Sequence, residues 1–367
     1  MKDSEPVSSN EILVNHDHLA TFVKEVFTNL GLPKTTAALA SDVLVVADLR
    51  GVSSHGCKRL ANFYVPLLQR GFIDIKAQLS VVQSQITLKC FNANAGLGLG
   101  LAPQAMMVAM DIAKQCGIGL VGVANSSHFG IASYYTLKAV EAGMIGIALT
   151  NGYPAVAPTG YENALLGTNS ISVACPSNNL PLVIDMAMSA TSLGYLEEMV
   201  SLNKPVPAYL AADRLRNKMN VNIEDEINPS EIVQNRMVAP LGSRDGRIGE
   251  YKGFVLSLII ELLTAIFPGG QMSFQLKRGG ACHFFVVINP EILGSPLRIE
   301  QMFAELSQKL ENTPFTSGYP RYRIPGYVSN QIQIERLKKG IPLHFSTINA
   351  LSKLADKLNI DRIPIFK

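Results

Sequence analysis

Cysteine is scarce in this chain of 367 residues, and the five that occur are widely separated, with no C-x-x-C pair. An odd, scattered set does not build a disulfide framework, and it lacks the paired spacing of a zinc site. The N-terminal segment also lacks the apolar core of a secretory signal. We therefore expect reduced thiols, a cytoplasmic location and no bound metal.

Long apolar runs and blocks of like charge are missing as well. The most apolar stretch, residues 254–268, contains Glu261 and is too short to span a bilayer, so it predicts a buried helix. The net charge is +3, and the basic residues are dispersed. These features argue against membrane insertion and against nucleic-acid binding. A hydrophobic content of 47% is typical of a globular enzyme.

Apolar residues at helical spacing dominate both ends of the chain. The first part predicts a helix that Asp17 caps and Gly31 ends, a second at 36–49, and a third that carries Leu60 to Leu68 and bends at Pro66. Expected helices at the other end cover 299–310, 331–339 and 346–358.

Short β-type runs alternate with helical segments in the middle of the chain. Expected strands cover 86–91, 119–124, 144–150, 171–174, 182–186 and 284–289, and expected helices cover 103–116, 131–142 and 252–267. Residues 205–250 hold few apolar runs, so we expect them to be irregular. We predict a discontinuous helical domain, residues 1–78 and 322–367, and an α/β domain, residues 79–321, with a helical or irregular excursion around 190–265.

A glycine motif, Gly117 to Gly122, matches G-x-G-x-x-G. In a Rossmann fold this motif follows a strand and opens a helix, whose N-terminus then holds pyrophosphate. Here a helical segment precedes the glycines and a strand-like run follows them. We interpret Gly117 as a helix C-cap, so a dinucleotide would have to bind in another way.

Two of the six histidines stand in turns of small residues. His55 follows Ser53-Ser54 and precedes Gly56, and Arg59 lies one helical turn farther on. An imidazole beside a guanidinium suits a substrate with a carboxylate next to a carbonyl, because arginine binds the carboxylate and histidine exchanges the proton. The alternative is a histidine that caps a helix, with an exposed arginine beside it.

The other candidate groups also have two interpretations each. His128 lies between a strand and a helix whose first amides could hold an anion, or it is a turn histidine bonded to backbone. Asp185 ends a strand, where it could orient His55 or cap a helix. Thr168 offers a hydroxyl before another strand, and Lys252 could meet a phosphate or remain a surface lysine.

Seven segments together resemble the malate/L-lactate dehydrogenase family of oxidoreductases that lack a Rossmann fold and use NAD or NADP. Each motif is weak alone, but they occur in the family's order across nearly the whole chain. They are Arg50-Gly51-Val52-Ser53-Ser54-His55-Gly56, Asn125 to Gly130, Leu149-Thr150-Asn151, Gly167-Thr168-Asn169, Asp185 to Ser189, Tyr251-Lys252-Gly253 and Pro325-Gly326.

The resemblance implies an α+β fold in which a mainly antiparallel sheet holds the cofactor, and a homodimer with its active site in a cleft. It implies His55 as proton donor or acceptor, helped by Ser54 and Asp185, with His128 as a second active-site histidine. Arg59 and Thr168 would contact the substrate. The residues implied to contact the cofactor are His128, Phe129, Asn151, Asp185, Met186, Ala187, Met188, Ser189, Lys252, Pro325 and Gly326.

We therefore expect a dehydrogenase that interconverts a 2-hydroxy acid and a 2-oxo acid, with malate first and NAD, or NADP, as cofactor. Ureidoglycolate, sulfolactate, diketogulonate and cyclic imine substrates are alternatives within the family. A hydrolase using Ser54, and a cofactor-binding protein without activity, are rivals of other classes. Tyr327, Ser170, Tyr195 and Ser127 depart from residues common in the family, which leaves NAD or NADP open.

Overall fold

A seven-stranded sheet forms the centre of the computed structural model, which describes residues 10–177, 180–243, 249, 251–294, 296–314, 316 and 323–364. The strand order is β2-β3-β4-β10-β5-β6-β7, and only the pair β3–β4 is parallel. The predicted α+β fold with a mainly antiparallel sheet is therefore confirmed. The strands are β2 (Ser80–Ser84), β3 (Leu88–Asn92), β4 (Ile118–Ser127), β5 (Ile145–Thr150), β6 (Ser170–Cys175), β7 (Leu182–Ala187) and β10 (Gly280–Ile288).

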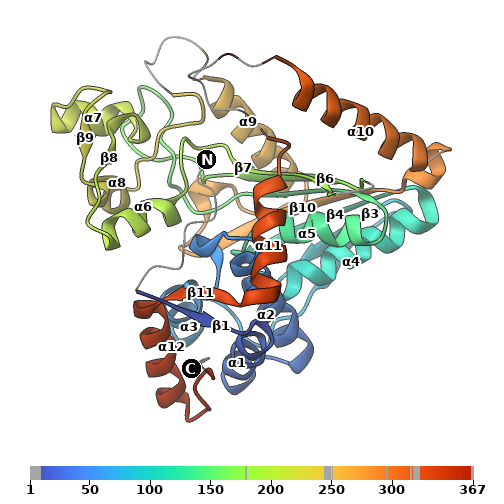
Figure 1. The fold of residues 1–367 in the computed structure, drawn as a ribbon, viewed down its shortest axis with the longest axis horizontal. Coiled ribbons are helices and arrows are strands. Elements are labelled where there is room, and N and C mark those ends of the chain that lie inside the picture. The colour runs from blue at the N-terminus through green and yellow to red at the C-terminus, as the bar shows by residue number, and fades with distance from the viewer. Residues whose placement is uncertain are drawn as a thin grey trace.

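Helices cover both faces of this sheet (Figure 1). Strand β10 shows why, because its side chains alternate between two cores. Phe285 packs with the cluster on the side of α4 (Gly98–Cys116) and α5 (Ala132–Glu141). Phe284 packs with Ile260 of α9 (Tyr251–Glu261) on the opposite side. A strand buried on both faces reads as a nearly continuous apolar run, as β10 does.

The N- and C-terminal parts of the chain lie side by side (Figure 1). Strand β1 (Glu11–Val14) pairs with β11 (Ile341–His344), next to α1 (His16–Asn29), α2 (Lys34–Leu49) and α12 (Phe345–Leu358). This is the arrangement that a discontinuous helical domain requires, while the domain boundaries stay predictions. Asn15, and not Asp17, caps α1, because its side chain accepts from two backbone amides.

The turn region after α2 is less regular than expected. A 3₁₀ turn, η1 (Ser53–His55), is followed by a π-helical turn, η2 (Leu60–Tyr64), and by α3 (Val65–Gln69). Pro66 stands in the first turn of α3, where a proline ring fits.

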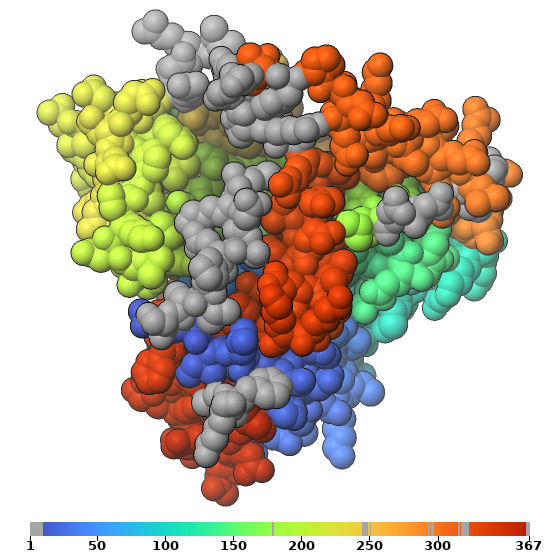
Figure 2. Space-filling view, in the orientation of Figure 1, coloured from blue at the N-terminus to red at the C-terminus, as the bar shows by residue number. Residues whose placement is uncertain are grey.

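Two C-terminal helices lie on the face of the molecule that Figure 2 shows. Helix α11 (Tyr327–Lys339) runs above the N-terminal helices, and α10 (Pro296–Asn312) lies at the upper right of the view.

Residues 205–250 were expected to be irregular, and within their described part this is wrong. Together with α6 (Leu193–Ser201), the short elements there enclose an apolar cluster of their own, which includes Val206, Leu215 and Ile232. The short elements are β8 (Val206–Pro207), α7 (Asp213–Met219), β9 (Glu226–Ile227) and α8 (Pro229–Asn235). We call residues 190–240 the small unit.

The G-x-G-x-x-G segment has the predicted structure. Gly117 is the C-cap of α4 with φ of 85°, a left-handed conformation that favours glycine, and β4 follows at once. No helix N-terminus therefore follows these glycines. Among the helices of the described ranges, none has the length and apolar character needed to span a bilayer.

Candidate active site

The turn that carries His55 is built on a buried carboxylate at the end of α2. Asp48 is 1% exposed and accepts a 2.7 Å hydrogen bond from the backbone amide of Cys57. A Cβ on Gly56 would lie 1.9 Å from Asp48 Oδ1, so a side chain cannot fit there. Burial raises the Asp48 pKa to about 6. Asp48 and Gly56 together fix the backbone on both sides of the His55 turn.

The His55 ring is half-buried and its Nδ1 lies 2.9 Å from Ser54 Oγ. Burial lowers its pKa to about 3, and the nearby Arg59 charge contributes to the shift. The imidazole is therefore neutral at pH 7. When Nδ1–H donates to Ser54 Oγ, Nε2 is left as the proton acceptor. No residue in the described part of the chain bonds this Nε2, so it is free for a substrate.

Arg59 is held by three contacts around the same turn. Its Nε donates to the Ser54 carbonyl at 2.7 Å, and its guanidinium lies 5.0 Å from the centre of the Phe63 ring. Glu197 of α6 accepts from it at 3.2 Å, which brings the small unit to the site. The Arg59 side chain is 14% exposed. A fixed, partly desolvated guanidinium is suited to bind a carboxylate in two-point geometry.

The second histidine lies against the first, with ring centres 5.5 Å apart. His128 Nδ1 accepts from the Gly130 amide at 3.2 Å and lies 2.7 Å from the Tyr64 hydroxyl. Because an amide can only donate, Nδ1 carries no proton and the neutral ring is protonated at Nε2. Burial, followed by Arg59, holds the His128 pKa well below its usual range. The site thus combines a proton acceptor with a neutral N–H donor.

Asp185 lies at the wall of the site but does not bond His55. It is solvent-accessible on β7, and its Oδ2 accepts from the Ser133 amide at 2.8 Å in the first turn of α5. The anion expected at this helix start is therefore Asp185 itself. Surrounding protein raises the Asp185 pKa, and Arg50 opposes that shift. A group that is accessible yet largely enclosed by protein is typical of a cleft.

Helix α11 joins the His55 turn to the strand that carries Asp185. Arg50, just before that turn, donates to Asn330 at 2.8 Å and to Gln333 at 2.9 Å. Just before α11 begins, the Pro325 carbonyl accepts from the Val183 amide of β7 at 3.1 Å. The Pro325-Gly326 turn therefore lies on the edge strand of the sheet. No sequence signal indicated that the Pro325-Gly326 turn would pair with Val183.

The remaining residues expected at the cofactor, and Thr168, expected at the substrate, differ in their burial. Asn151 and Phe129 are buried: the Asn151 amide bonds Glu261 and two backbone groups, and Phe129 stacks on His283 at 4.5 Å. Met188 and Ser189 are also buried, and Thr168 and Ala187 are half-buried. Met186 and Lys252 are exposed.

Several site residues were missed from the sequence. Tyr64, Phe63 and Glu197 contact His128 or Arg59 but stand in ordinary helical patterns, so no local signal marks them. Asp48 could have been found as a charged residue on the apolar face of a helix. Within the described ranges, no group of three or more His, Cys, Asp or Glu side chains is placed to hold a metal ion.

Comparison with known proteins shows the family to which the chain belongs. The family model described as malate/L-lactate dehydrogenase matches residues 14–352. The chain belongs to the malate/L-lactate dehydrogenase family. It is 34% identical to a malate dehydrogenase from Pyrococcus horikoshii over 97% of this chain and 98% of that protein. It is 29% identical to an L-sulfolactate dehydrogenase from Methanocaldococcus jannaschii over 92% of this chain and 94% of that protein.

Solved structures agree with the family assignment. The crystal structure of malate dehydrogenase from Entamoeba histolytica superposes with a TM-score of 0.89 at 28% identity, over 96% of this chain and 99% of that one. The chain is accordingly an oxidoreductase that acts on CH–OH groups, and its relatives are hydroxyacid dehydrogenases.

Proposed function

We propose that this enzyme interconverts a 2-hydroxy acid and a 2-oxo acid, with malate and oxaloacetate as the first pair, and that His55 transfers the proton. The observation that carries the proposal is the neutral His55 ring, which bonds Ser54 Oγ, next to Arg59, which bonds the Ser54 carbonyl. A 2-hydroxy acid presents a hydroxyl and a carboxylate on adjacent carbons, and these two groups match the imidazole and the guanidinium.

In the oxidising direction, His55 Nε2 takes the hydroxyl proton while Ser54 Oγ accepts from Nδ1–H and holds the ring in this tautomer. Arg59 binds the carboxylate and thereby fixes the carbon that loses hydride. Reduction is the reverse. A carboxylate on Arg59 cancels part of the charge that depresses the His55 pKa, so substrate binding makes the protonated, proton-donating ring easier to populate.

His128 has a different role in this proposal. Its Nδ1 is occupied by the Gly130 amide and the Tyr64 hydroxyl, so only Nε2–H is available. A neutral N–H stabilises oxygen as it gains negative charge but does not supply the proton. We assign proton transfer to His55 and polarisation of the substrate to His128.

A nicotinamide cofactor would supply or accept the hydride. The residues fit such a group: Asp185 offers an accessible carboxylate to carboxamide or ribose donors, whereas exposed Met186, the next residue of β7, faces the opposite side of the sheet and stays a predicted contact. The Pro325-Gly326 turn on the same strand would border it. Phe129, Asn151, Ala187, Met188, Ser189 and Lys252 stay predicted contacts, with Thr168 on the substrate. We propose NAD, with NADP as the alternative.

We also propose a homodimer, because α9 leaves an apolar face exposed in the single chain. Its hydrophobic residues are spread around the helix, and Val255, Leu258 and Ile259 are each between 43% and 47% exposed. A helix that is hydrophobic on all sides is normally buried. A second copy that covers this face would bury it.

We also propose a reducing compartment such as the cytosol. It fits the five cysteines, all of which are unpaired.

The deciding experiment is a screen of NADH and NADPH oxidation with oxaloacetate, pyruvate, sulfopyruvate and other 2-oxo acids. The proposal expects rapid absorbance loss with oxaloacetate and slower loss with shorter acids. Faster turnover of another 2-oxo acid would identify that acid as the better substrate, since small pocket differences decide among such acids. Binding of NADH without turnover of any acid would contradict the proposal.

Two variants test the assigned roles. His55→Ala should lower kcat by about 10²-fold or more and leave NADH binding intact, because only the proton transfer is lost. The control is His18→Ala, an exposed histidine on α1. Arg59→Ala should chiefly raise KM for the acid, whereas Arg70→Ala, also exposed, should not. An unchanged kcat in His55→Ala would contradict the assignment of proton transfer to His55.

The rival hypothesis, a hydrolase that uses Ser54, lacks structural support because Asp185 bonds Ser133 instead of His55.

A further inference from the structure

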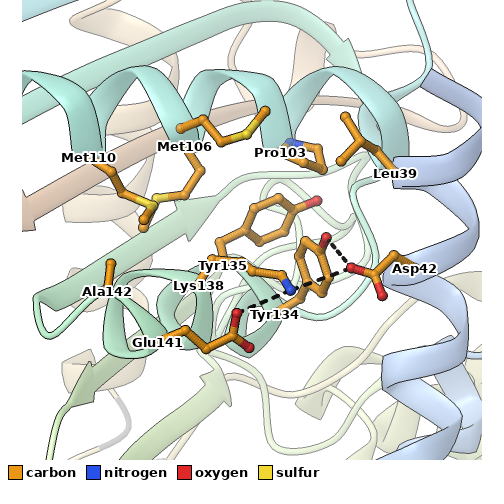
Figure 3. Close-up of a pocket in the computed structure, with 11 residues that line it drawn as sticks. Leu39, Asp42, Pro103, Met106, Met110, Tyr134, Tyr135, Lys138, Glu141 and Ala142 are labelled. Atoms are coloured by element: carbon orange, nitrogen blue, oxygen red, sulfur yellow. Dashed lines mark hydrogen bonds and ion pairs between the residues drawn. The ribbon is translucent and has the colours of Figure 1, made fainter. Parts of the chain in front are cut away.

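A pocket of about 430 Å³ opens between α2, α4 and α5, and its lining contains none of the site residues described above (Figure 3). Leu39 and Asp42 come from α2, Pro103 and three methionines from α4, and the rest from α5 and its end. Its volume is in the range of small-molecule sites. The complete lining is Leu39, Asp42, Pro103, Met106, Met107, Met110, Tyr134, Tyr135, Lys138, Glu141 and Ala142.

The inner wall is apolar and adaptable. Met107 is 47% exposed at the surface of the pocket, whereas Met106 and Tyr135 are 1% and 0% exposed, so a ligand reaches them only as the flexible methionines shift. Methionine thioethers conform to ligands of varied shape and make favourable contacts with aromatic rings. Figure 3 shows Met106 and Met110 on the α4 side of the pocket and Tyr134 and Tyr135 on the α5 side. This wall suits the flat, apolar body of an aromatic ligand.

The rim is polar and carries a net negative charge. Lys138 Nζ lies 3.5 Å from Asp42 Oδ2 and 3.3 Å from Glu141 Oε2, so one ammonium is shared by two carboxylates. The Tyr134 hydroxyl donates to Asp42 at 2.7 Å. Asp42, Lys138 and Glu141 are the only charged groups in the lining. With one charge uncompensated, the rim attracts a cation and repels an anion.

We propose that this pocket is a second binding site, for a small aromatic amine whose ring lies among the methionines and whose ammonium pairs with Asp42 and Glu141. The substrates of the proposed function are anions, so the two sites select opposite charges. Tyr135 also donates to the Phe129 carbonyl at 2.5 Å, and Phe129 follows His128 in the chain. The pocket wall is thus one residue away from the catalytic cleft.

The test uses three probes of similar size on the full-length protein: 2-phenylethylamine, 2-phenylethanol and 3-phenylpropionate. Calorimetric titration at low salt should give a Kd on the order of 0.1–1 mM for the amine. We expect the alcohol to bind about three- to tenfold more weakly and the carboxylate weaker still. Equal affinity for amine and alcohol, or no amine binding, would overturn the proposal.

Variants locate the binding. Asp42→Asn with Glu141→Gln leaves Lys138 as the only charge in the lining, so the preference should reverse toward 3-phenylpropionate. The control Asp111→Asn removes a charge from exposed α4 surface outside the pocket and should keep the preference for the amine. Met107→Trp fills the opening from a residue that is 47% exposed and should abolish binding of all three probes. Amine binding that survives Met107→Trp would place the site elsewhere.

Discussion

At the scale of single residues, the charge of Arg59 acts on the protonation of His55. Burial is the larger cause of the low His55 pKa, about 3, and Arg59 is the second. Arg59→Gln should therefore raise the His55 pKa but leave it below the ordinary value of 6.5. Proton NMR titration of the His55 ring measures this directly, and His344, exposed and remote on β11, is the control. An unchanged His55 pKa would show that the two groups are not coupled.

The pH dependence of catalysis follows from the same coupling. In the free enzyme the base form of His55 persists down to about pH 3, so kcat/KM for oxidation should have no acid limb from His55 above pH 5. In the complex, the substrate carboxylate offsets the Arg59 charge and the pKa rises. The acid limb of kcat should therefore lie at higher pH than that of kcat/KM. Limbs in the reverse order, measured in full pH–rate profiles, would contradict this account.

Residues that act with their sequence neighbours were open to prediction. The spacing of His55 and Arg59 suggested that they share one helical face; in the structure a 3₁₀ turn and extended Gly56 separate them, and Arg59 reaches the turn through the Ser54 carbonyl. Partners from distant segments of the chain could not be predicted in this way. Asp185 was expected to orient His55, but it bonds Ser133 of α5, because the register of β7 brings it to that helix end. Glu197 reaches Arg59 only through the folding of the small unit.

At the scale of elements, one buried carboxylate connects α9 to the strands beneath it. Glu261 is 3% exposed and accepts from Asn169 at 2.8 Å, from Asn151 at 3.3 Å and from the Ser273 amide at 3.0 Å. The Ser273 hydroxyl is a fourth donor. Four donors converge on the two carboxylate oxygens, so each of these donors has a hydrogen-bond acceptor.

Glu261→Gln should lower the free energy of unfolding by about 2–3 kcal/mol. The glutamine NH₂ group would replace an acceptor oxygen and face N–H and O–H groups that also donate. Urea denaturation at fixed protein concentration measures the change, since the stability of the proposed dimer would depend on concentration. Glu25→Gln, on the exposed face of α1, is the matched control and should change the stability by less than about 0.5 kcal/mol. An equally small effect for Glu261→Gln would contradict the network's importance.

Periodicity predicted most elements because burial on one face or on both leaves a pattern. It missed β2, whose five residues are all exposed and which pairs only with β3 at the sheet edge. It also missed the π-helical turns η2 and η4 (Leu262–Ile266), which the pattern shows as ordinary helix. In the small unit, elements of two to nine residues are too short for a period to be visible.

At the scale of the whole molecule, the exposed face of α9 predicts the assembly state. If a second copy covers this face, a charge placed there must be desolvated, and the interface will open. Ile259→Glu, at a position that is 47% exposed in the single chain, should convert a dimer into a monomer. Light scattering coupled to size-exclusion chromatography measures the mass of each. Ile86→Glu, at an 84% exposed position in the turn between β2 and β3, should leave the dimer intact. A monomeric parent protein, or a dimer that survives Ile259→Glu, would place the partner elsewhere or exclude it.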